Sequence, residues 1–397
     1  VCTMRPMNGT AGAPTKTLCI EGWRGINHSI GMVNQNQILA WLQLPGWQLY
    51  HRDAPYFLPH WSRSTLSAGF SAEEQALIDA LAPPPEGQLL DGCYRIASPI
   101  RLGTAGAARR TGTFVVTEVG DLAFEPNELD IRRLTQGADF IVTPSHWSRE
   151  RLIERGFDGD AIRVVPHGYK TDVFQPLTAA ERLEARQRVG IAPEEIVLCN
   201  VGVSTWNKGV ELAVLGYVQL RSEGFPVRLI LKDHKGLYGL GVERVMADLM
   251  QREPLLQRAD IQSGIMVISS SLNLHQLRSL YGLADAYVSP YRAEGFNLPV
   301  LEAMGCGTWV IVTGGGATDD FVPPALGHRL ASRPSRLANT PAGQGRFMAP
   351  EVEDLVEALR AVAERRIPQG PAQQAARQAL AERYNWGRVT AELAAQF

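Results

Sequence analysis

The sequence lacks the patterns of a disulfide scaffold or a zinc-binding module. Its five cysteines are an odd number and lie far apart, with no Cys-x-x-Cys pair, at Cys2, Cys19, Cys93, Cys199 and Cys306. Such a set gives neither a disulfide framework nor a zinc site of ordinary spacing. Cysteines kept as thiols fit a reducing compartment, so we expect the protein in the cytoplasm.

Long apolar runs and an excess of one charge are also missing. No apolar stretch approaches the ~20 residues that a bilayer-spanning helix needs, although peripheral contact with a membrane is left open. Residues 1–16 are polar and rich in small residues, without the apolar core of a signal peptide, and we expect a flexible leader there. The formal net charge is −2 and no long basic run occurs. We therefore expect no nucleic-acid partner.

The sequence does contain a regular alternation of short β-branched runs and helical patterns. A chain of 397 residues is longer than a domain with a single hydrophobic core usually is. We expect a first series of strands at 17–22, 113–118, 140–145 and 162–168, and a second at 196–202, 228–233, 265–270, 286–290 and 309–316. One sheet would not hold so many strands comfortably. The pattern therefore predicts an α/β protein with two doubly wound domains.

The boundary between the domains is expected near 169–180, where strand character is lost and a charged helical pattern begins. This gives an N-terminal domain of residues 1–175 and a C-terminal domain of residues 176–397. The segment 331–345 combines Pro, Gly, Ser and Asn, a composition typical of a surface loop.

The segment 291–307, YRAEGFNLPVLEAMGCG, contains the strongest functional signal. Glu294 and Glu302 lie eight positions apart, and Pro299 suits the first turn of a helix, where its missing N–H costs nothing. Glu294 then lies in a loop before the helix and Glu302 inside it, close to the free N–H groups of a helix start, which favour an anion. A buried glutamate can accept both hydroxyls of a ribose, and a loop glutamate can accept those of a sugar. The segment is therefore suited to a nucleotide diphosphate-sugar.

The same segment resembles the donor-site signature of family-four retaining glycosyltransferases. The shared features are Glu-x7-Glu, Gly-Phe after the first glutamate, and Glu-Ala-Met-x-x-Gly at the second, carried here by EGFNLPVLEAMGCG. An ordinary amphipathic helix with Glu302 in solvent is the alternative. The resemblance implies the GT-B fold, in which two Rossmann-like domains face each other across a cleft and a C-terminal helix crosses back to the first domain.

In such a protein the second domain holds the donor and the first faces the acceptor. Carried onto this chain, the resemblance implies that the donor contacts come from Glu294, Gly295, Phe296, Asn297, Leu298 and Glu302.

The segment 202–209, GVSTWNKG, is a second candidate for donor binding. It follows a predicted strand and lacks the Gly-Lys-Ser/Thr ending of a Walker loop, so ATP hydrolysis is not indicated. It resembles the family's phosphate loop, in which an arginine and a lysine neutralise the donor diphosphate. Lys208 matches the lysine, whereas Val203 stands where arginine is common. Lys232, which ends the next strand, is a candidate for part of the missing charge, and either lysine could instead be a solvated surface residue.

The first domain contributes two further candidates. Gly25 lies in a glycine-containing loop after the first predicted strand, and the corresponding loop of the family faces the cleft below the donor. A simple turn is the alternative. The predicted strand 113–118 ends at Glu118, close to where the family has a histidine aimed at the transferred sugar. Glu118 is therefore a candidate for that contact. Because the family has a histidine there, a protein of reduced activity is a second interpretation.

The resemblance implies transfer of a sugar, with retention of its anomeric configuration, to a hydroxyl of a carbohydrate, lipid-linked or protein acceptor. Glu294, Lys208 and Glu118 are then the catalytic candidates, and no cofactor or metal ion is required. Asp158 and Asp160 match a DxD metal motif, but Asp and Gly are typical turn residues. Two alternatives stay open: a nucleotide-sugar epimerase of the same architecture, and a donor-binding partner without turnover.

Overall fold

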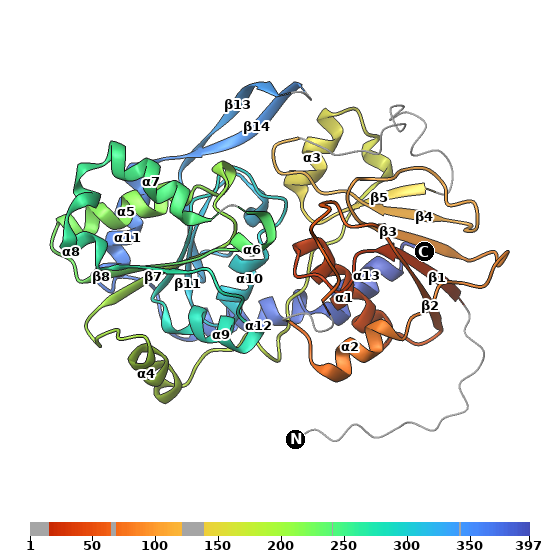
Figure 1. Cartoon of the computed structure of the whole chain (residues 1–397), viewed down its shortest axis with the longest axis horizontal. Helices are drawn as coiled ribbons and strands as arrows, with labels where there is room; N and C mark the ends of the chain where they lie inside the picture. The colour runs from red at the N-terminus through yellow and green to blue at the C-terminus, as the bar shows by residue number, and fades with distance from the viewer. Residues whose placement is uncertain (1–15, 65–68, 121–138, 240, 341–342) are drawn as a thin grey trace.

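The computed structural model describes residues 16–64, 69–120, 139–239, 241–340 and 343–397. The leader expected at 1–16 therefore lies, apart from Lys16, outside the described residues. Two parallel sheets of six strands each form the centres of two α/β domains that lie side by side (Figure 1). This confirms the predicted architecture of two doubly wound domains. No helix among the described residues is long and apolar enough to cross a bilayer.

The first sheet has the strand order β2-β1-β3-β4-β5-β6. Its strands are β1 Lys16–Gly22, β2 Trp47–Asp53, β3 Gly92–Ile96, β4 Thr111–Phe114, β5 Asp139–Thr143 and β6 Ile162–Val164. Leu18 and Ile20 of β1 are fully buried on the face covered by α1 (Ser29–Trp41). Helices α2 (Ala72–Asp79) and α3 (His146–Glu154) complete the domain.

Strands β2 and β3 are not predicted from the sequence, and β4 is shorter than expected. The predicted strand 113–118 ends at Phe114, so Glu118 lies in the loop that follows β4 and not at a strand end. Strand β2 is an edge strand, and its sequence WQLYHRD carries polar residues without a continuous apolar run. A strand that contacts one neighbour and is half exposed gives only a weak hydrophobic pattern.

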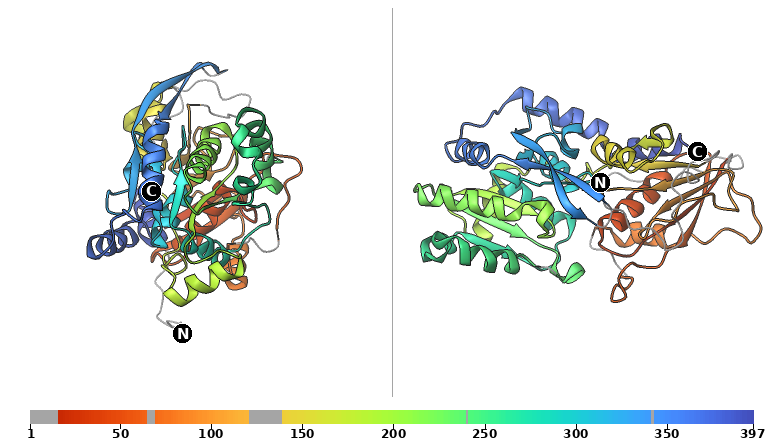
Figure 2. Two further views of the ribbon diagram at one scale, coloured as in Figure 1. Left: turned by 90° about the vertical axis from the view of Figure 1, so that its left-hand side faces the viewer. Right: turned by 90° about the horizontal axis from the view of Figure 1, so that it is seen from above.

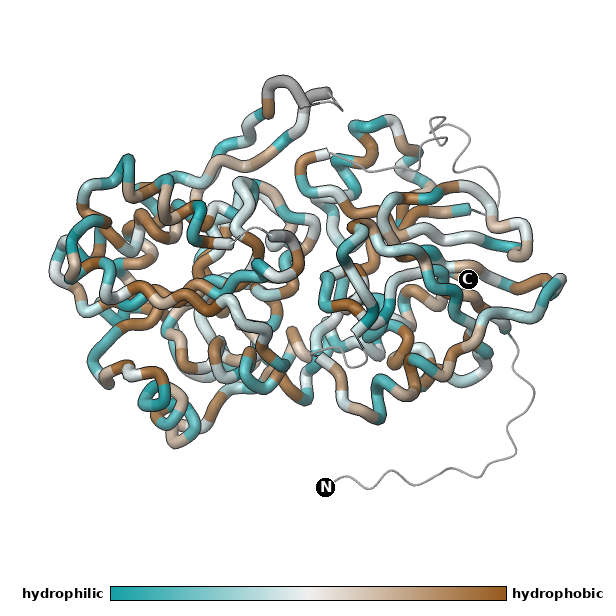
Figure 3. The backbone as a smooth tube through the Cα atoms, in the orientation of Figure 1, coloured by the Kyte–Doolittle hydropathy of each residue, from teal (hydrophilic) through white to brown (hydrophobic). Residues whose placement is uncertain are grey.

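The second sheet has the order β12-β11-β10-β7-β8-β9. Its strands are β7 Ile196–Val201, β8 Val227–Lys232, β9 Ile265–Ile268, β10 Ala286–Ser289, β11 Trp309–Thr313 and β12 Gly327–Leu330. One face packs on α9 (Leu274–Leu283) and α10 (Leu298–Gly305), and the other on α5 (Val210–Ser222), α7 (Val242–Arg252) and α11 (Val352–Ala363). Both faces are covered, so the central strands are mostly apolar (Figure 3). The short helices α4 Ala179–Arg188, α6 Lys235–Tyr238 and α8 Ala259–Gln262 lie between these elements.

The segment 331–345 forms much of an antiparallel hairpin and is not the surface loop that its composition predicts. Strands β13 (Ser332–Thr340) and β14 (Gly343–Pro350) pair from Ser332 opposite Pro350. Each strand has only the other as a partner, so a proline at position 334 is tolerated as on any edge strand. The hairpin projects above the junction of the domains (Figure 1). The Arg346 N–H donates to the Val119 carbonyl of the first domain at 3.0 Å.

The end of the chain crosses back to the first domain, as predicted. After α12 (Pro371–Arg383), helix α13 (Trp386–Ala394) packs against α1, and Figure 2 shows the C-terminus beside the first sheet. The Phe397 ring lies 5.1 Å from Phe140 and 6.0 Å from Trp41, between ring centroids. This returning segment lies against the segment that leads out of the first domain, since a Cβ on Gly168 would lie 2.8 Å from the Trp386 backbone nitrogen.

Candidate functional site

The lysine of the predicted phosphate loop lies at the carboxyl edge of the second sheet. Lys208 ends a short 3-10 turn, Trp206–Lys208, between β7 and α5. Gly209 follows with φ +64°, and a Cβ there would lie 2.1 Å from the Pro290 carbonyl oxygen. Only glycine combines that backbone conformation with so close an approach. Gly209 therefore sets the position of Lys208.

We expect Gly209→Ala to lower the free energy of unfolding by at least about 2 kcal/mol, because it adds left-handed strain and a clash. Gly224→Ala is the matched control, since Gly224 has φ +91° and nothing within 4 Å of an added Cβ. Urea unfolding of the two variants measures the difference. Equal losses would show that the clash at Gly209 is relieved without cost.

Charged side chains from both domains meet at Lys208. Its Nζ donates to Glu294 Oε2 at 2.7 Å and to Glu118 Oε1 at 2.8 Å. Glu294 lies in the loop after β10 and is 7% exposed, whereas Glu118 comes from the first domain. The sequence predicts each of these residues separately as part of the site. The structure brings all of them into one hydrogen-bonded cluster.

Burial and charge set the protonation of this cluster. Burial opposes the charge on Lys208, but the attraction of Glu118 and Glu294 outweighs it and raises the pKa of the ammonium group. Burial raises the pKa of Glu294 to about 7, against the opposing attraction of Lys208. Lys208 therefore keeps its positive charge in a largely buried position, where an anionic group gains most from it.

The second motif glutamate lies inside α10 and has a tyrosine partner. The Tyr281 hydroxyl, from α9, donates to Glu302 Oε2 at 2.9 Å. Burial raises the pKa of Glu302 to about 8, and the hydrogen bond from Tyr281 lowers it only in part. Tyr281 is fully buried, so this hydrogen bond fixes the orientation of the carboxyl group. No sequence pattern singles out Tyr281, because a tyrosine in an amphipathic helix is most often a core residue.

The start of α10 has the predicted form. Asn297 adopts a left-handed conformation, φ 80°, as the residue before the helix, which begins at Leu298 with Pro299 in its first turn. The Asn297 Nδ2 donates to Ser289 Oγ, at the end of β10, at 3.0 Å. Asn297 thereby fixes where the helix N–H groups point, beside the loop that carries Glu294.

Gly295 is the point where the loop after β10 meets the first domain. Its carbonyl oxygen accepts from Ser145 Oγ at 2.7 Å, and a Cβ on Gly295 would lie 2.2 Å from Val116 Cγ2. Glycine is needed here because side chains of the first domain pack directly on its backbone. Ser145 has no motif around it that predicts this role.

The side chain of Phe296 lies in an aromatic cluster and not in an open donor site. It is 4% exposed, stacks on Phe321 at 4.7 Å between ring centroids, and meets His167 edge-on at 5.0 Å. His167 is also buried, and burial lowers its pKa to about 3, so it is a neutral packing residue. Only the backbone of Phe296 is therefore suited to the predicted donor contact.

Lys232 lies beside the start of the phosphate loop. It pairs with Val201 in the register of β7 and β8, and the Gly202 N–H donates to its carbonyl oxygen at 2.9 Å. Lys232 is 3% exposed, and its Nζ donates to the Asp233 carbonyl; no described carboxylate forms an ion pair with it. Burial lowers the pKa of this ammonium group. Lys232 is therefore a buried cation rather than the surface lysine that was the alternative.

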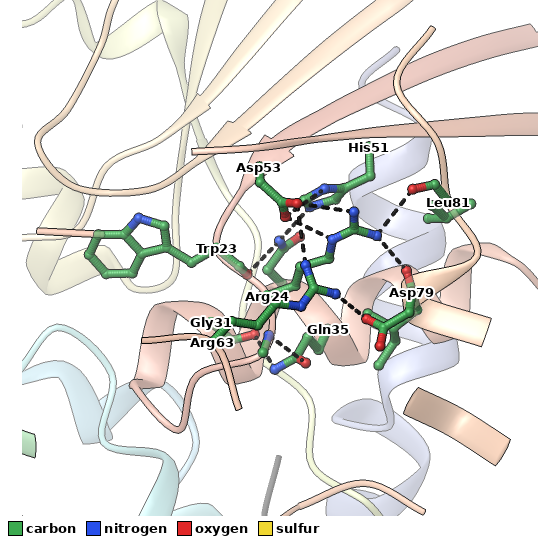
Figure 4. Close-up of polar contacts among 12 residues, drawn as sticks. Trp23, Arg24, Gly31, Gln35, His51, Asp53, Arg63, Asp79 and Leu81 are labelled. Carbon is green, nitrogen blue, oxygen red and sulfur yellow. Dashed lines mark hydrogen bonds and ion pairs between the residues drawn. The ribbon is translucent and has the colours of Figure 1, made fainter. Parts of the chain in front are cut away.

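Gly25 forms a turn whose described contacts include Arg63 and Ser64 of the first domain, and its contact with a donor stays a prediction. It has φ +75°, its carbonyl oxygen accepts from the Ser64 N–H at 2.7 Å, and a Cβ there would lie 2.6 Å from Arg63 Cγ. Figure 4 shows the hydrogen bonds that hold Arg63 in place beside Gly25: Arg63 and the buried Arg24 both bind Asp53. The segment beside Gly25 also reaches the second domain, since Trp61 Nε1 donates to the Leu237 carbonyl oxygen at 2.8 Å.

The described residues contain no group of three or more His, Cys, Asp or Glu side chains that could hold a metal ion. The DxD pair acts as a turn, since Asp158 Oδ1 accepts from the Asp160 N–H at 2.9 Å. This contact fits the turn interpretation of that motif.

Comparisons with known proteins identify relatives of part of this chain. Residues 181–331 match the family model described as glycosyl transferases group 1. The GDP-mannose-dependent alpha-(1-6)-phosphatidylinositol monomannoside mannosyltransferase of Mycolicibacterium smegmatis is 25% identical over 225 residues, which are 55% of each chain. The D-inositol 3-phosphate glycosyltransferase of Actinosynnema mirum is 32% identical over 195 residues, 46% of this chain and 45% of that protein. The chain thus spans about half the length of these curated relatives.

The whole fold also has solved counterparts. The Anabaena protein HepE, solved in complex with UDP-glucose, superposes with a TM-score of 0.64 at 14% identity, covering 96% of this chain and 98% of that one. At that identity the likeness shows the fold alone. The chain therefore has the GT-B fold, and its residues 181–331 are similar to the group 1 glycosyl transferases.

Proposed function

We propose that the protein is a retaining glycosyltransferase that moves a sugar from a nucleotide diphosphate-sugar to an acceptor hydroxyl. One observation carries the proposal: Lys208 and Glu294, from loops after the neighbouring strands β7 and β10, meet at 2.7 Å at the carboxyl edge of the second sheet. Ligands of open α/β sheets bind at that edge. The match of residues 181–331 to group 1 glycosyl transferases supports the same conclusion.

The proposed chemistry is electrostatic. Lys208 stabilises the negative charge that develops on the departing diphosphate. Lys232 supplies the second positive charge, because this chain has Val203 at the position where arginine is common in the family. Glu302, oriented by Tyr281, accepts the ribose hydroxyls, and Glu294 positions the sugar. The acceptor hydroxyl then attacks from the face that the diphosphate leaves, which retains the anomeric configuration, and the leaving phosphate takes the proton.

The relatives suggest which donors and acceptors to test. One relative is named for GDP-mannose, and one structural neighbour is solved with UDP-glucose. Two relatives are named for inositol-containing acceptors, D-inositol 3-phosphate and phosphatidylinositol monomannoside. We propose a UDP- or GDP-sugar as donor and a carbohydrate, lipid-linked or protein hydroxyl as acceptor. The four described cysteines are free thiols, which fits a cytoplasmic protein.

The testing experiment incubates the protein with UDP- and GDP-sugars, with and without inositol phosphates, and follows both the donor and the free nucleotide. A glycosyltransferase releases nucleoside diphosphate and forms a glycoside of the donor's own anomeric configuration. Conversion of the donor into an isomer without release would identify an epimerase. Donor binding without either change would identify a non-catalytic partner, and both outcomes contradict transfer.

We expect transfer to be independent of divalent metal. The diphosphate charge is balanced by Lys208 and Lys232 rather than by an ion, so activity should change less than twofold in excess EDTA. Initial rates before and after chelation measure this. Loss of activity that manganese restores would contradict the assignment of the two lysines to the diphosphate.

A further inference from the structure

The carboxylate of Glu118 is bound by two side chains of the phosphate loop. Its Oε1 accepts from Lys208 Nζ at 2.8 Å, and its Oε2 accepts from Asn207 Nδ2 at 2.5 Å. Both carboxylate oxygens are therefore held by side chains of the second domain, although Glu118 belongs to the first. Asn207 and Lys208 together bind an anionic group through two oxygens, as a phosphate site does.

This pair of donors, which we call the cradle, is built into the donor domain. Asn207 Nδ2 also donates to the Ala293 carbonyl oxygen at 3.1 Å, and the Asn207 carbonyl accepts from the Arg292 N–H at 2.7 Å. These contacts tie Asn207 to the loop that carries Glu294. The cradle therefore keeps its shape through bonds that do not involve Glu118.

A diphosphate and Glu118 cannot both use the cradle. An amide nitrogen has two N–H donors, and both of Asn207 are engaged, one by Glu118 and one by the Ala293 carbonyl. Of the three donors of Lys208, two are engaged by Glu118 and Glu294. A phosphate within hydrogen-bond distance would also meet the like charge of the Glu118 carboxylate in a partly buried site.

We propose that Asn207 and Lys208 form the phosphate cradle of the donor site, and that Glu118 competes with the donor diphosphate for it. This inference rests on the proposed function, and it adds Asn207 as a phosphate-binding residue and Glu118 as an internal competitor. Donor binding displaces the Glu118 side chain from both of its partners.

The displacement is a movement of a side chain and not of a domain. The Glu118 carbonyl accepts from Trp147 Nε1 at 2.7 Å, and the next residue, Val119, accepts the N–H of Arg346. The backbone at Glu118 is thus held while its side chain, 41% exposed, is free to leave the cradle on the solvent side. Glu118 then lies in the cleft, where the transferred sugar is bound.

Calorimetric titration with UDP and with GDP tests the proposal on three variants. A competitor that fills a site nine-tenths of the time weakens a ligand about tenfold, so Glu118→Gln should bind the nucleotide about tenfold more tightly than wild type. Asn207→Ala combined with Glu118→Gln should bind it about tenfold more weakly than Glu118→Gln alone, because one hydrogen bond to a charged group is lost. In the wild-type background the loss should be smaller, because Asn207→Ala also removes a hydrogen bond from the competing Glu118.

Glu154→Gln is the matched control. Glu154 forms another ion pair between the domains, with Arg346 at 3.0 Å. It does not contact Asn207 or Lys208, so its replacement should leave nucleotide affinity unchanged. An unchanged affinity of Glu118→Gln, or an equal gain in Glu154→Gln, would overturn the competition. Equal affinities of Glu118→Gln and of the double variant would remove Asn207 from the phosphate site. Failure of the wild-type protein to bind either nucleotide would instead defeat the proposed function and this inference with it.

Discussion

Replacing Lys208 by alanine is expected to lower kcat for sugar transfer by about 10²–10³-fold, the usual effect of removing one preorganised group that stabilises charge in a transition state. The effect should fall on kcat more than on KM, because the charge on the leaving diphosphate grows as the bond to the sugar breaks. Initial rates over a range of donor concentrations measure both constants.

Lys235→Ala is the control for the loss of a lysine near the same edge of the sheet. Lys235 is about half exposed and paired with Glu243, so its removal should leave both constants unchanged. A melting temperature for each variant shows whether Lys208→Ala is folded, since the change leaves Glu118 and Glu294 without their shared cation. A folded Lys208→Ala variant with wild-type kcat would refute the role of the lysine.

Replacing Glu302 by alanine is expected to weaken the binding of UDP or GDP by about 10- to 100-fold, because the ribose loses both of its hydrogen bonds to this carboxyl group, each worth about 0.5–1.5 kcal/mol. The loss should be equal for the free nucleotide and for the intact donor, since the ribose is present in both. Glu294→Ala is the contrasting variant, because its carboxylate is assigned to the sugar. It should impair binding of the nucleotide-sugar and spare that of the nucleotide. Wild-type nucleotide affinity in Glu302→Ala would disprove the ribose contact.

The sequence predicts the parts of the site that are local in the chain. The order of Glu294, Pro299 and Glu302 specifies a loop followed by a helix, and the structure has that loop and that helix. The position of Lys208 is also specified by its neighbours in the chain, because the left-handed conformation of Gly209 directs the backbone into α5. The central strands are also predictable, since a sheet covered on both faces leaves continuous apolar runs.

The parts that the sequence does not predict depend on tertiary contacts. The bond of Glu118 to Asn207 joins residues 89 positions apart, and neither has a pattern that indicates the other. Phe296 looks like a donor contact in the motif, yet it packs on Phe321 and His167. The hairpin of β13 and β14 has the composition of a loop, and only the pairing of its two strands with each other gives it regular structure.

A crystal structure of the protein with UDP or GDP tests the central claim most directly. The account predicts the diphosphate at Lys208 and Asn207, with the Glu118 carboxylate moved out of hydrogen-bond reach of both, and the ribose hydroxyls on Glu302 beside Tyr281. A nucleotide bound elsewhere, or one whose phosphates leave Glu118 on Lys208 and Asn207 while its ribose does not reach Glu302, would contradict it.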